Sequence, residues 1–373
     1  MMVKVKICSR CVMDNQSDNS IVFNKNGECN YCTDTIKRMS DEYFPNEIGQ
    51  KKLVETFDMI KKEMKNEKYD CLVGVSGGLD SSYIIYLGNK YGLRMLAVHI
   101  DDGLDTDIAK NNIKNLCVKA NVDIIYIKPN MCEYKDILKS FLLARVPNLA
   151  MPQDNILSAT LNDVIRENKF KYFLSGVNFS LESILERGNG INANDKVHIK
   201  SIHKKFGKIA LKDTRFTSFF ENYITNKYVN KIKYIAPLNY IDYNLKGAIS
   251  DLEEFCGYNY YGGKHYESIL TRFLQCYYLP IKYGFDKRKS HFSSMIVSRQ
   301  MTREEALEKL KKSPYLDDNL KESDFNFLAE YFNMSREEFD ELIAQQPLQH
   351  TDYKTSYINN FANIARKFRK YLG

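Results

Sequence analysis

Short apolar runs alternate with longer amphipathic stretches through the middle of the chain. The apolar runs cover residues 71–75, 95–100, 122–127 and 172–174. Each is the length of a buried strand, and the stretches between them are long enough to hold helices. Such alternation is typical of a parallel sheet wrapped by helices. The pattern therefore predicts an α/β fold for this part of the chain.

The flanking segments show helical periodicity. Residues 47–68 place apolar side chains close to a 3.6-residue period, with lysines and glutamates between them. From about Asn244 the chain also reads as helices, and capping boxes are expected at Thr302 and Ser335. The predicted organisation is a cysteine-containing module over 1–40, a linker helix within 41–68, the sheet domain over 69–243 and a mostly helical region over 244–373.

The composition describes a globular protein. Hydrophobic residues make up 44% of the 373 residues and charged residues 27%, and no run approaches the roughly 20 apolar residues of a membrane helix. The first residues lack the apolar stretch of a secretory signal, so we expect a cytoplasmic protein without a membrane association. The formal charge of +7 fits an anionic substrate such as ATP or a nucleotide sugar as well as it fits RNA.

Four of the nine cysteines form two closely spaced pairs near the start of the chain. Cys8 and Cys11 are separated by two residues, as are Cys29 and Cys32, and seventeen residues lie between the pairs. This spacing is that of a four-thiolate zinc ribbon, with Gly27 at the turn before the second pair. Because protein ligands fill all four positions, we expect the Zn²⁺ to be structural.

A glycine turn follows the first predicted strand. Its residues are Ser76, Gly77, Gly78, Leu79, Asp80, Ser81 and Ser82, after which a helix begins. Backbone N–H groups at a helix N-terminus, close approach of glycine backbone and serine hydroxyls together make a phosphate site. Asp80 would repel phosphate, so we expect it to hold Mg²⁺ or to orient the loop.

This turn resembles the PP-loop of the ATP pyrophosphatases, whose SGGxDS pattern it matches at each fixed position. The resemblance implies that ATP is split between the α and β phosphates and that a carbonyl oxygen of the substrate is adenylated. It also implies that two further strand ends border the nucleotide. Here they correspond to residues 99–103, with Asp101, and to residues 175–178, with Ser175 and Gly176.

Over nearly its whole length the sequence also resembles the N-acetyl sugar amidotransferases, which convert an acetamido group on a sugar into an acetamidino group. The segments that carry this resemblance are residues 8–14, the PP-loop, 202–207, 263–268, 271–273, 279–280, 284–291 and 300–307. One departure is Arg299, at a helix end where a glycine would be expected.

The resemblance draws attention to a polar cluster between residues 263 and 291. We expect Lys264, Arg272 and Lys287 to bind the carboxylate or phosphate of the sugar. His265 or Glu267 is expected to transfer protons from the incoming nitrogen. Together with Asp80, the residues Lys264, His265, Glu267 and Arg272 form the predicted catalytic set.

The sugar itself stays open, because the family acts on nucleotide-linked amino sugars of lipopolysaccharide and on nonulosonic acids of the pseudaminic or legionaminic type, which decorate flagellin or surface polysaccharide. Glutamine hydrolysis needs an activated cysteine, and none is evident, so we expect ammonia to come from a separate glutaminase subunit.

Two other functions compete with this interpretation. A transfer RNA thiolation enzyme also combines a zinc ribbon with a PP-loop, but it usually needs sulfur-carrying cysteines or an iron–sulfur site near the nucleotide, and no further C-x-x-C follows Cys32. A non-catalytic RNA-binding ribbon would not need Ser76, Asp80 and Ser81, all of which are present. Nucleic acid is therefore the less favoured partner.

Overall fold

The computed structural model describes residues 5–18, 20–186 and 191–357, and a five-stranded parallel sheet lies at its centre. The strands lie side by side in the order β3-β2-β1-β4-β5. Their bounds are β1 Cys71–Gly74, β2 Met95–Ile100, β3 Asp123–Ile127, β4 Tyr172–Leu174 and β5 Lys233–Ile235. The predicted α/β fold class is confirmed, and four of the five strands lie on the predicted apolar runs.

Helices cover both faces of the sheet. Side chains of one strand point alternately to opposite sides, and apolar side chains occur on both. Cys71 and Val73 of β1 belong to one apolar core, and Leu72 belongs to another. The first core includes helices α2 Glu47–Glu63, α3 Leu79–Lys90, α4 Asp107–Ala120 and α9 Leu245–Cys256. The opposite face packs against α6 Met151–Glu167. This arrangement explains the continuous burial of β2.

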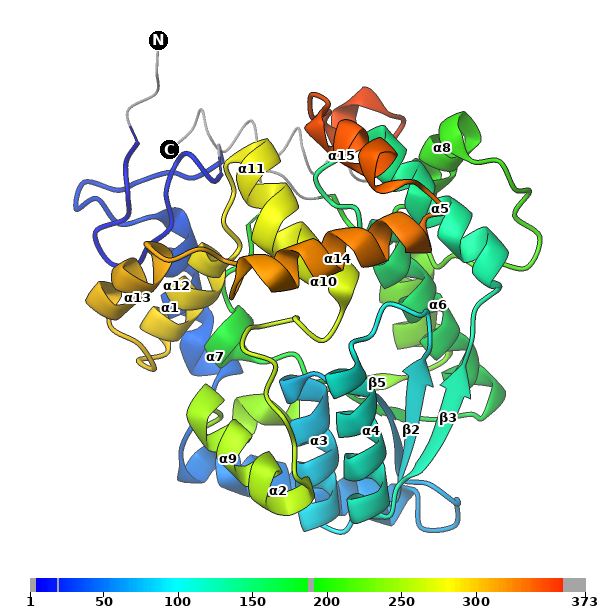
Figure 1. The fold of residues 1–373 in the computed structure, drawn as a ribbon. Helices are drawn as coiled ribbons and strands as arrows, with labels where there is room; N and C mark the ends of the chain where they lie inside the picture. Colours follow the sequence, from blue (N-terminus) through cyan, green and yellow to red (C-terminus); the bar gives the residue numbers. More distant parts are fainter. Residues whose placement is uncertain (1–4, 19, 187–190, 358–373) are drawn as a thin grey trace.

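A second body of helices lies above the carboxyl ends of the strands (Figure 1). Its core joins Phe141 of α5 to Phe273, Phe325 and Phe339 of later helices. The helices that build it are α5 Met131–Ala144, α8 Lys196–Phe206, α10 Ile269–Phe273, the π-helix η3 Leu274–Tyr278, α11 Leu279–Tyr283, α14 Asp318–Tyr331 and α15 Arg336–Ala344. The C-terminal region is thus helical, as predicted. Packing crosses residue 244 in both directions, and the domain boundaries stay a prediction.

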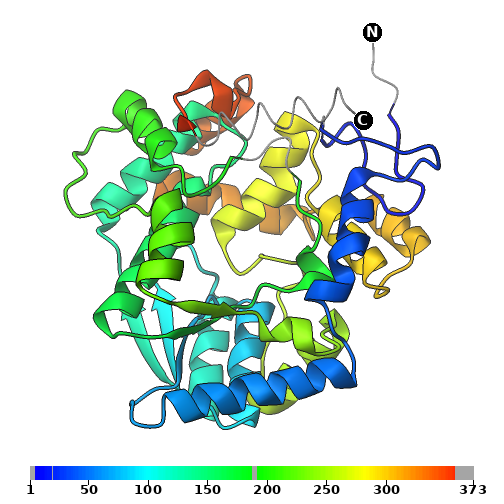
Figure 2. The ribbon, with the colours of Figure 1, turned by 180° about the vertical axis from the view of Figure 1, so that it is seen from behind.

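The remaining helices are short or lie at the edges of these bodies. They are α1 Asn30–Glu42, α7 Phe179–Glu182, η2 Pro237–Tyr240, α12 Arg288–Val297, α13 Arg303–Leu310 and η4 His350–Asp352. In Figure 2 the N-terminal module and α1 (dark blue) lie beside α12 and α13. Thr302 and Ser335 form the expected capping boxes. No helix among the described residues is long and apolar enough to cross a bilayer.

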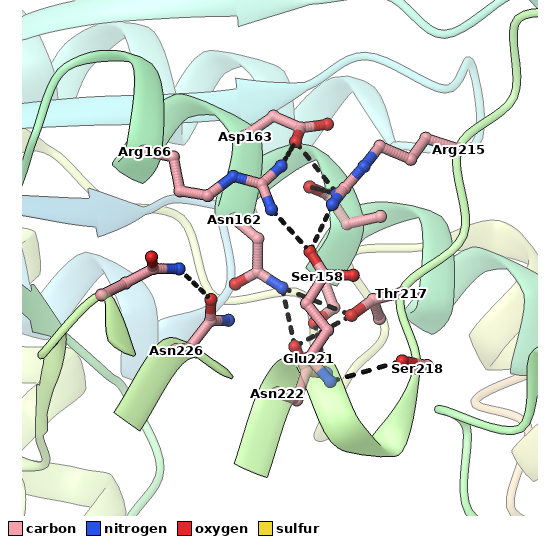
Figure 3. A network of polar contacts seen from close by, with 12 residues as sticks. Ser158, Asn162, Asp163, Arg166, Arg215, Thr217, Ser218, Glu221, Asn222 and Asn226 are labelled. Atoms are coloured by element: carbon pink, nitrogen blue, oxygen red, sulfur yellow. Dashed lines mark hydrogen bonds and ion pairs between the residues drawn. The ribbon is translucent and has the colours of Figure 1, made fainter. Parts of the chain in front are cut away.

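A network of charged and amide side chains holds the π-helix η1 (Glu221–Val229) against α6 (Figure 3). Arg166 and Arg215 each contact both Asp163 and Glu221. An amide contact adds to these ion pairs, since Asn162 Nδ2 donates to Asn222 Oδ1 over 2.6 Å. The network fixes the outer face of α6, whose inner face borders the cavity described below.

Several element ends differ from the sequence-based expectations. Helix α2 ends at Glu63 rather than near residue 68, and α3 begins at Leu79, inside the glycine turn. Strand β5 was not predicted, because its residues Lys233, Tyr234 and Ile235 include a charge and are mostly exposed, so they form no apolar run like that of β4. Arg299 has φ +64°, a left-handed conformation that glycine adopts without strain. The backbone at this position therefore favours the glycine that was expected from the family resemblance.

Two buried histidines fasten η4 to α8. His350 Nδ1 lies 2.9 Å from His198 Nε2, and His198 Nδ1 lies 3.1 Å from the carbonyl oxygen of Lys354. The backbone N–H of Asn148 donates to His350 Nε2. These partners assign His198 Nδ1 and His350 Nδ1 as donors and both Nε2 atoms as acceptors, so each ring is neutral. Burial lowers both pKa values, that of His350 to about 3.

This pair predicts a loss of stability in mild acid. Because the folded pKa of His350 lies below the value of about 6.5 in the unfolded chain, protons bind the unfolded chain first as the pH falls below about 6.5. By pH 5 the loss from His350 should reach about 2 kcal/mol. In urea titrations between pH 7.5 and 5, His350→Gln should lose less stability than the wild type. Thr351→Ala, an exposed change in the same turn, should follow the wild type; equal slopes for all three proteins would contradict the assignment.

Candidate active site and metal centre

The glycine turn between β1 and α3 has the geometry of an anion site. Gly78 is the N-cap of α3 and offers no side-chain cap, so the helix N-terminus can accept an anion there. Ser76 Oγ accepts from the Gly78 N–H and lies 3.2 Å from Ser81 Oγ. Gly77 has φ +74°, and a Cβ there would lie 2.5 Å from the Ala109 carbonyl oxygen. Only glycine fits at that position.

Asp80 joins this turn to the C-terminal half of the chain. Its Oδ1 accepts from the Tyr243 hydroxyl over 2.5 Å, and its Oδ2 lies 2.7 Å from Lys264 Nζ. Lys264 Nζ also lies 3.1 Å from Glu182 Oε1. Burial disfavours the ammonium charge, but Asp80 and Glu182 outweigh it and raise the pKa of Lys264. Lys264 is therefore a cation beside the phosphate loop.

His265 lies in a strained conformation between two carboxylates. Its φ is +62°, and its Nε2 and Nδ1 lie 3.4 Å and 3.8 Å from oxygens of Glu182 and Glu267. Burial opposes protonation, but the nearby carboxylates of Glu182 and then Glu267 raise the pKa of His265 to about 9. The ring is an imidazolium at neutral pH, and a residue held so is a candidate for function.

One cavity of about 1040 Å³ opens over the carboxyl ends of the strands and contains this cluster. Its volume is at the upper end of ordinary ligand sites, so it has room for two substrates. Ten predicted site residues line it: Ser76, Gly78, Asp80, Ser81, Ser175, Gly176, Lys264, His265, Glu267 and Lys287. The structure thus brings together two predicted groups that lie nearly 200 residues apart in sequence.

Four predicted site residues do not line this cavity. Gly77 packs against α4, and the hydroxyl of Ser82 is buried without a hydrogen-bond partner among the described residues. Asp101 accepts from the Gly103 N–H and closes a turn after β2. Arg272 donates through Nε and Nη2 to both carboxylate oxygens of Asp324 and is 7% exposed.

The position of Arg272 corrects its expected role. A guanidinium already paired in a fork with Asp324 has no free face for a sugar carboxylate. It joins α10 to α14, and its Nη1 also donates to the Tyr266 carbonyl oxygen, 3.2 Å away. Arg272 therefore positions the wall that carries His265 and Glu267. Lys287, also expected to bind an anion, does line the cavity, and its Nζ lies 2.7 Å from Glu186 Oε2.

The sequence interpretation missed several polar residues of the cavity. Glu182 and Glu186 follow the end of β4, and Glu186 Oε1 is buried without a hydrogen-bond partner among the described residues. Asp154 is exposed on the cavity wall, where desolvation by the surrounding residues raises its pKa to about 6 against the opposing effect of His265 and Lys287. Burial, with Lys264 and Lys287 nearby, lowers the pKa of His291 well below its usual range. A protonated and a neutral histidine thus lie with ring centroids 5.8 Å apart.

A sequence signal existed for only part of this set. Glu182 and Glu186 are spaced by four residues just beyond a predicted strand end, which places two acids near the ligand edge of the sheet. His291 belongs to the polar cluster that the sequence singled out, but no role was predicted for it, and Asp154 lies in an ordinary helical pattern that gave no signal.

The four predicted cysteine ligands meet at one point. The sulfurs of Cys8, Cys11, Cys29 and Cys32 lie within 4.8 Å of one another, and three of the separations are 3.6–3.7 Å. Thiolates 2.3 Å from a tetrahedral zinc ion lie about 3.8 Å apart, so the cluster fits that ion. Backbone N–H groups of Arg10, Cys11 and Cys29 donate to Cys8 Sγ. Gly27 has φ +77° at the expected turn.

Comparison with known proteins finds a family model that matches the C-terminal part of the chain. Residues 267–368 match the model of the family described as "LPS biosynthesis protein WbpG-like, C-terminal domain", over about a quarter of the chain. None of the curated proteins matches the sequence. The matched segment begins at Glu267, on the cavity wall.

Among solved structures, the chain is similar to the NH3-dependent NAD synthetase from Campylobacter jejuni subsp. jejuni NCTC 11168, in complex with the nitrate ion. The identity is 20%, and the alignment covers 35% of this chain and 57% of that one, with a TM-score of 0.27. This chain thus spans little more than half of the synthetase. A likeness of this size bears on neither fold nor function.

The cysteine cluster predicts that zinc binding contributes to folding. Cys29→Ser with Cys32→Ser should release zinc and lower the unfolding temperature, because a structural metal adds folding free energy directly. Metal content by mass spectrometry and thermal unfolding measure both effects. Cys132→Ser, at an exposed cysteine outside the cluster, is the control. Full zinc retention in the double variant would exclude the assignment.

Proposed function

We propose that this chain converts the acetamido group of a sugar into an acetamidino group, using ATP and ammonia, in the biosynthesis of a surface polysaccharide or flagellin glycan. The observation that carries the proposal is the contact between the phosphate loop and the polar segment 263–268 within one cavity, through Asp80 and Lys264. The similarity of residues 267–368 to an LPS biosynthesis domain supports the pathway.

The reaction solves a problem of leaving groups. Ammonia does not displace an amide oxygen, so the acetamido oxygen first attacks the α phosphorus of ATP, and pyrophosphate leaves. Ammonia then adds to the adenylated imidate carbon, and AMP leaves with the former amide oxygen. Each step develops negative charge on phosphate oxygens, which fixed cations and N–H groups stabilise.

The residues of the phosphate loop bind and orient the nucleotide. The N-terminus of α3 and the hydroxyls of Ser76 and Ser81, which lie 3.2 Å apart, could donate to a phosphate of the bound nucleotide. Magnesium needs only one or two protein carboxylates beside the phosphates, and Asp80 can supply one. Because Asp80 already accepts from Tyr243 and Lys264, magnesium would take the Asp80 oxygen now bonded to the Lys264 ammonium. Glu182 would still hold that ammonium.

The two histidines differ in protonation. His265, an imidazolium with a pKa of about 9, can donate to the departing AMP oxygen. Burial and the nearby Lys264 and Lys287 keep the pKa of His291 well below its usual range, so its ring stays neutral and adds no positive charge to the site. Glu182, whose Oε1 lies 3.4 Å from His265 Nε2, is the main group that keeps His265 protonated, and Glu267, 3.8 Å from Nδ1, adds to the effect.

The other cysteines argue against a thiolation enzyme. Cys276 lines the cavity, but its S–H donates to the Tyr266 hydroxyl, and burial raises its pKa to about 12. A sulfur carrier needs a thiolate, so Cys276 does not suit that role. Burial also raises the pKa of Cys117 to about 11 and that of Cys71 further. We therefore keep thiolation as the second candidate and place the amidine reaction in the cytoplasm, where ATP is available.

The first prediction of this mechanism concerns the products. With ATP, Mg²⁺, ammonia and a panel of nucleotide-linked amino sugars and nonulosonic acids, the protein should form AMP and pyrophosphate, and mass spectrometry should show O replaced by NH. Asp80→Ala and Ser76→Ala should abolish this turnover, a fall of about 100-fold or more, with zinc content unchanged.

Matched controls for these variants are Asp107→Ala, whose side chain is 96% exposed, and Ser40→Ala, which is also exposed. Both should keep wild-type turnover. ADP and phosphate as products would exclude the PP-loop chemistry, and RNA-dependent release of pyrophosphate would favour the thiolation enzyme.

The second prediction concerns the nitrogen source. The pure chain should use ammonium salts best at alkaline pH, where more ammonia is unprotonated, and should not use glutamine. A separate glutaminase subunit should restore glutamine use. Nitrogen-15 incorporation from amide-labelled glutamine measures the difference. Efficient glutamine use by the pure chain, lost on mutation of one of the cysteines outside the zinc cluster, would overturn this prediction.

A further inference from the structure

The zinc module lies behind the cavity wall rather than on it. Its apolar cluster, formed around the four cysteines, includes Ile184 of the segment after α7 and Val297 of α12. Polar contacts reinforce this docking. Arg303 donates to the carbonyl oxygens of Cys8 and Cys11, and the Val12 N–H donates to Ser293 Oγ. The module is therefore attached to two elements that carry cavity residues.

One peptide group is held from both sides by these elements. Helix α1 begins at the cysteine pair, and its Thr35 and Arg38 both donate to the carbonyl oxygen of Ser183. The N–H of Ile184, which belongs to the same planar peptide unit, donates to Ser294 Oγ of α12 over 2.9 Å. The orientation of this peptide is thus fixed between α1 and α12.

The clamped peptide lies between the two carboxylates of the cavity. Glu182 precedes it and holds Lys264 and His265, and Glu186 follows it and holds Lys287. The side chains of Glu182 and Glu186 are 17% and 4% exposed, so the backbone sets their positions more than solvent does. A shift of the Ser183–Ile184 peptide would move both acids relative to the phosphate loop.

We propose that the zinc module is a positioning element of the active site, and that Thr35 and Arg38 are positioning residues that act through the Ser183 carbonyl on Glu182 and Glu186. This rests on the proposed function only in treating the cavity as the reaction site. The metal takes no part in the chemistry; it fixes the start of α1, and α1 fixes the peptide. Displacements of about 1 Å in such a site can lower a rate by about 100-fold.

The test uses full-length, zinc-loaded protein with Thr35→Val and Arg38→Ala, singly and together. Hydrogen exchange of the peptide spanning residues 179–186 should become faster, while zinc content stays at the wild-type level. Turnover should fall by about 10-fold or more. Because Glu182 is the main support of the His265 charge, the alkaline limb of the pH–rate profile should move to lower pH.

Two controls separate positioning from general damage. Lys37→Ala changes an exposed residue of the same helix and should leave exchange, zinc content and turnover unchanged. Thr35→Ser keeps the donor hydroxyl and should restore slow exchange. Unchanged exchange at residues 179–186 in Arg38→Ala and Thr35→Val would overturn the proposal. Exchange does not depend on the reaction, so it stays informative even if the wild type forms no amidine, the outcome that would exclude the proposed function.

Discussion

The buried contact of Lys264 with Asp80 and Glu182 is the interaction on which the arrangement of the site depends. It joins the first turn of α3, the end of α7 and the loop before α10, three segments with no local reason to meet. The ammonium is part-buried between the two carboxylates, so the contact fixes the three segments relative to one another at the cavity. Glu182, which takes part in this contact, also raises the pKa of His265.

Much of the fold was predictable because its signals are local. The runs at 95–100 and 172–174 coincide with β2 and β4, and the capping boxes at Thr302 and Ser335 form as expected. The glycine turn and the cysteine pairs carry their chemistry in spacing alone. Strand β5 was not predicted because Lys233 and its exposed neighbours form no apolar run, and its pairing with β4 is set by tertiary contact.

The candidate site was predictable only in part. Arg272 looked like an anion ligand because sequence shows a charge but not its partner, and Asp324 lies 52 residues away. His265 and His291 are the same residue type, yet one is held charged by Glu182 and Glu267 and the other is held neutral by burial near cations. Such differences arise from packing and cannot be assigned from spacing. The sequence resemblance pointed to the polar segment 263–291, and the structure shows which of its side chains face the cavity.

The wide separation of Asp80 and Lys264 in the sequence has a consequence during synthesis of the chain on the ribosome. All four cysteines of the cluster have been synthesised once residue 32 leaves the ribosome. Asp80 must then wait for Lys264, 184 residues later, which takes about 10–40 s at ordinary rates of translation. Late in this interval the nascent chain holds both Asp80 and Glu182 without their cation, and the apolar faces of α5 and α8 without the later helices. A chain that stalls shortly before residue 264 therefore exposes unpaired carboxylates and apolar helix faces, the kind of surface that chaperones and proteases bind.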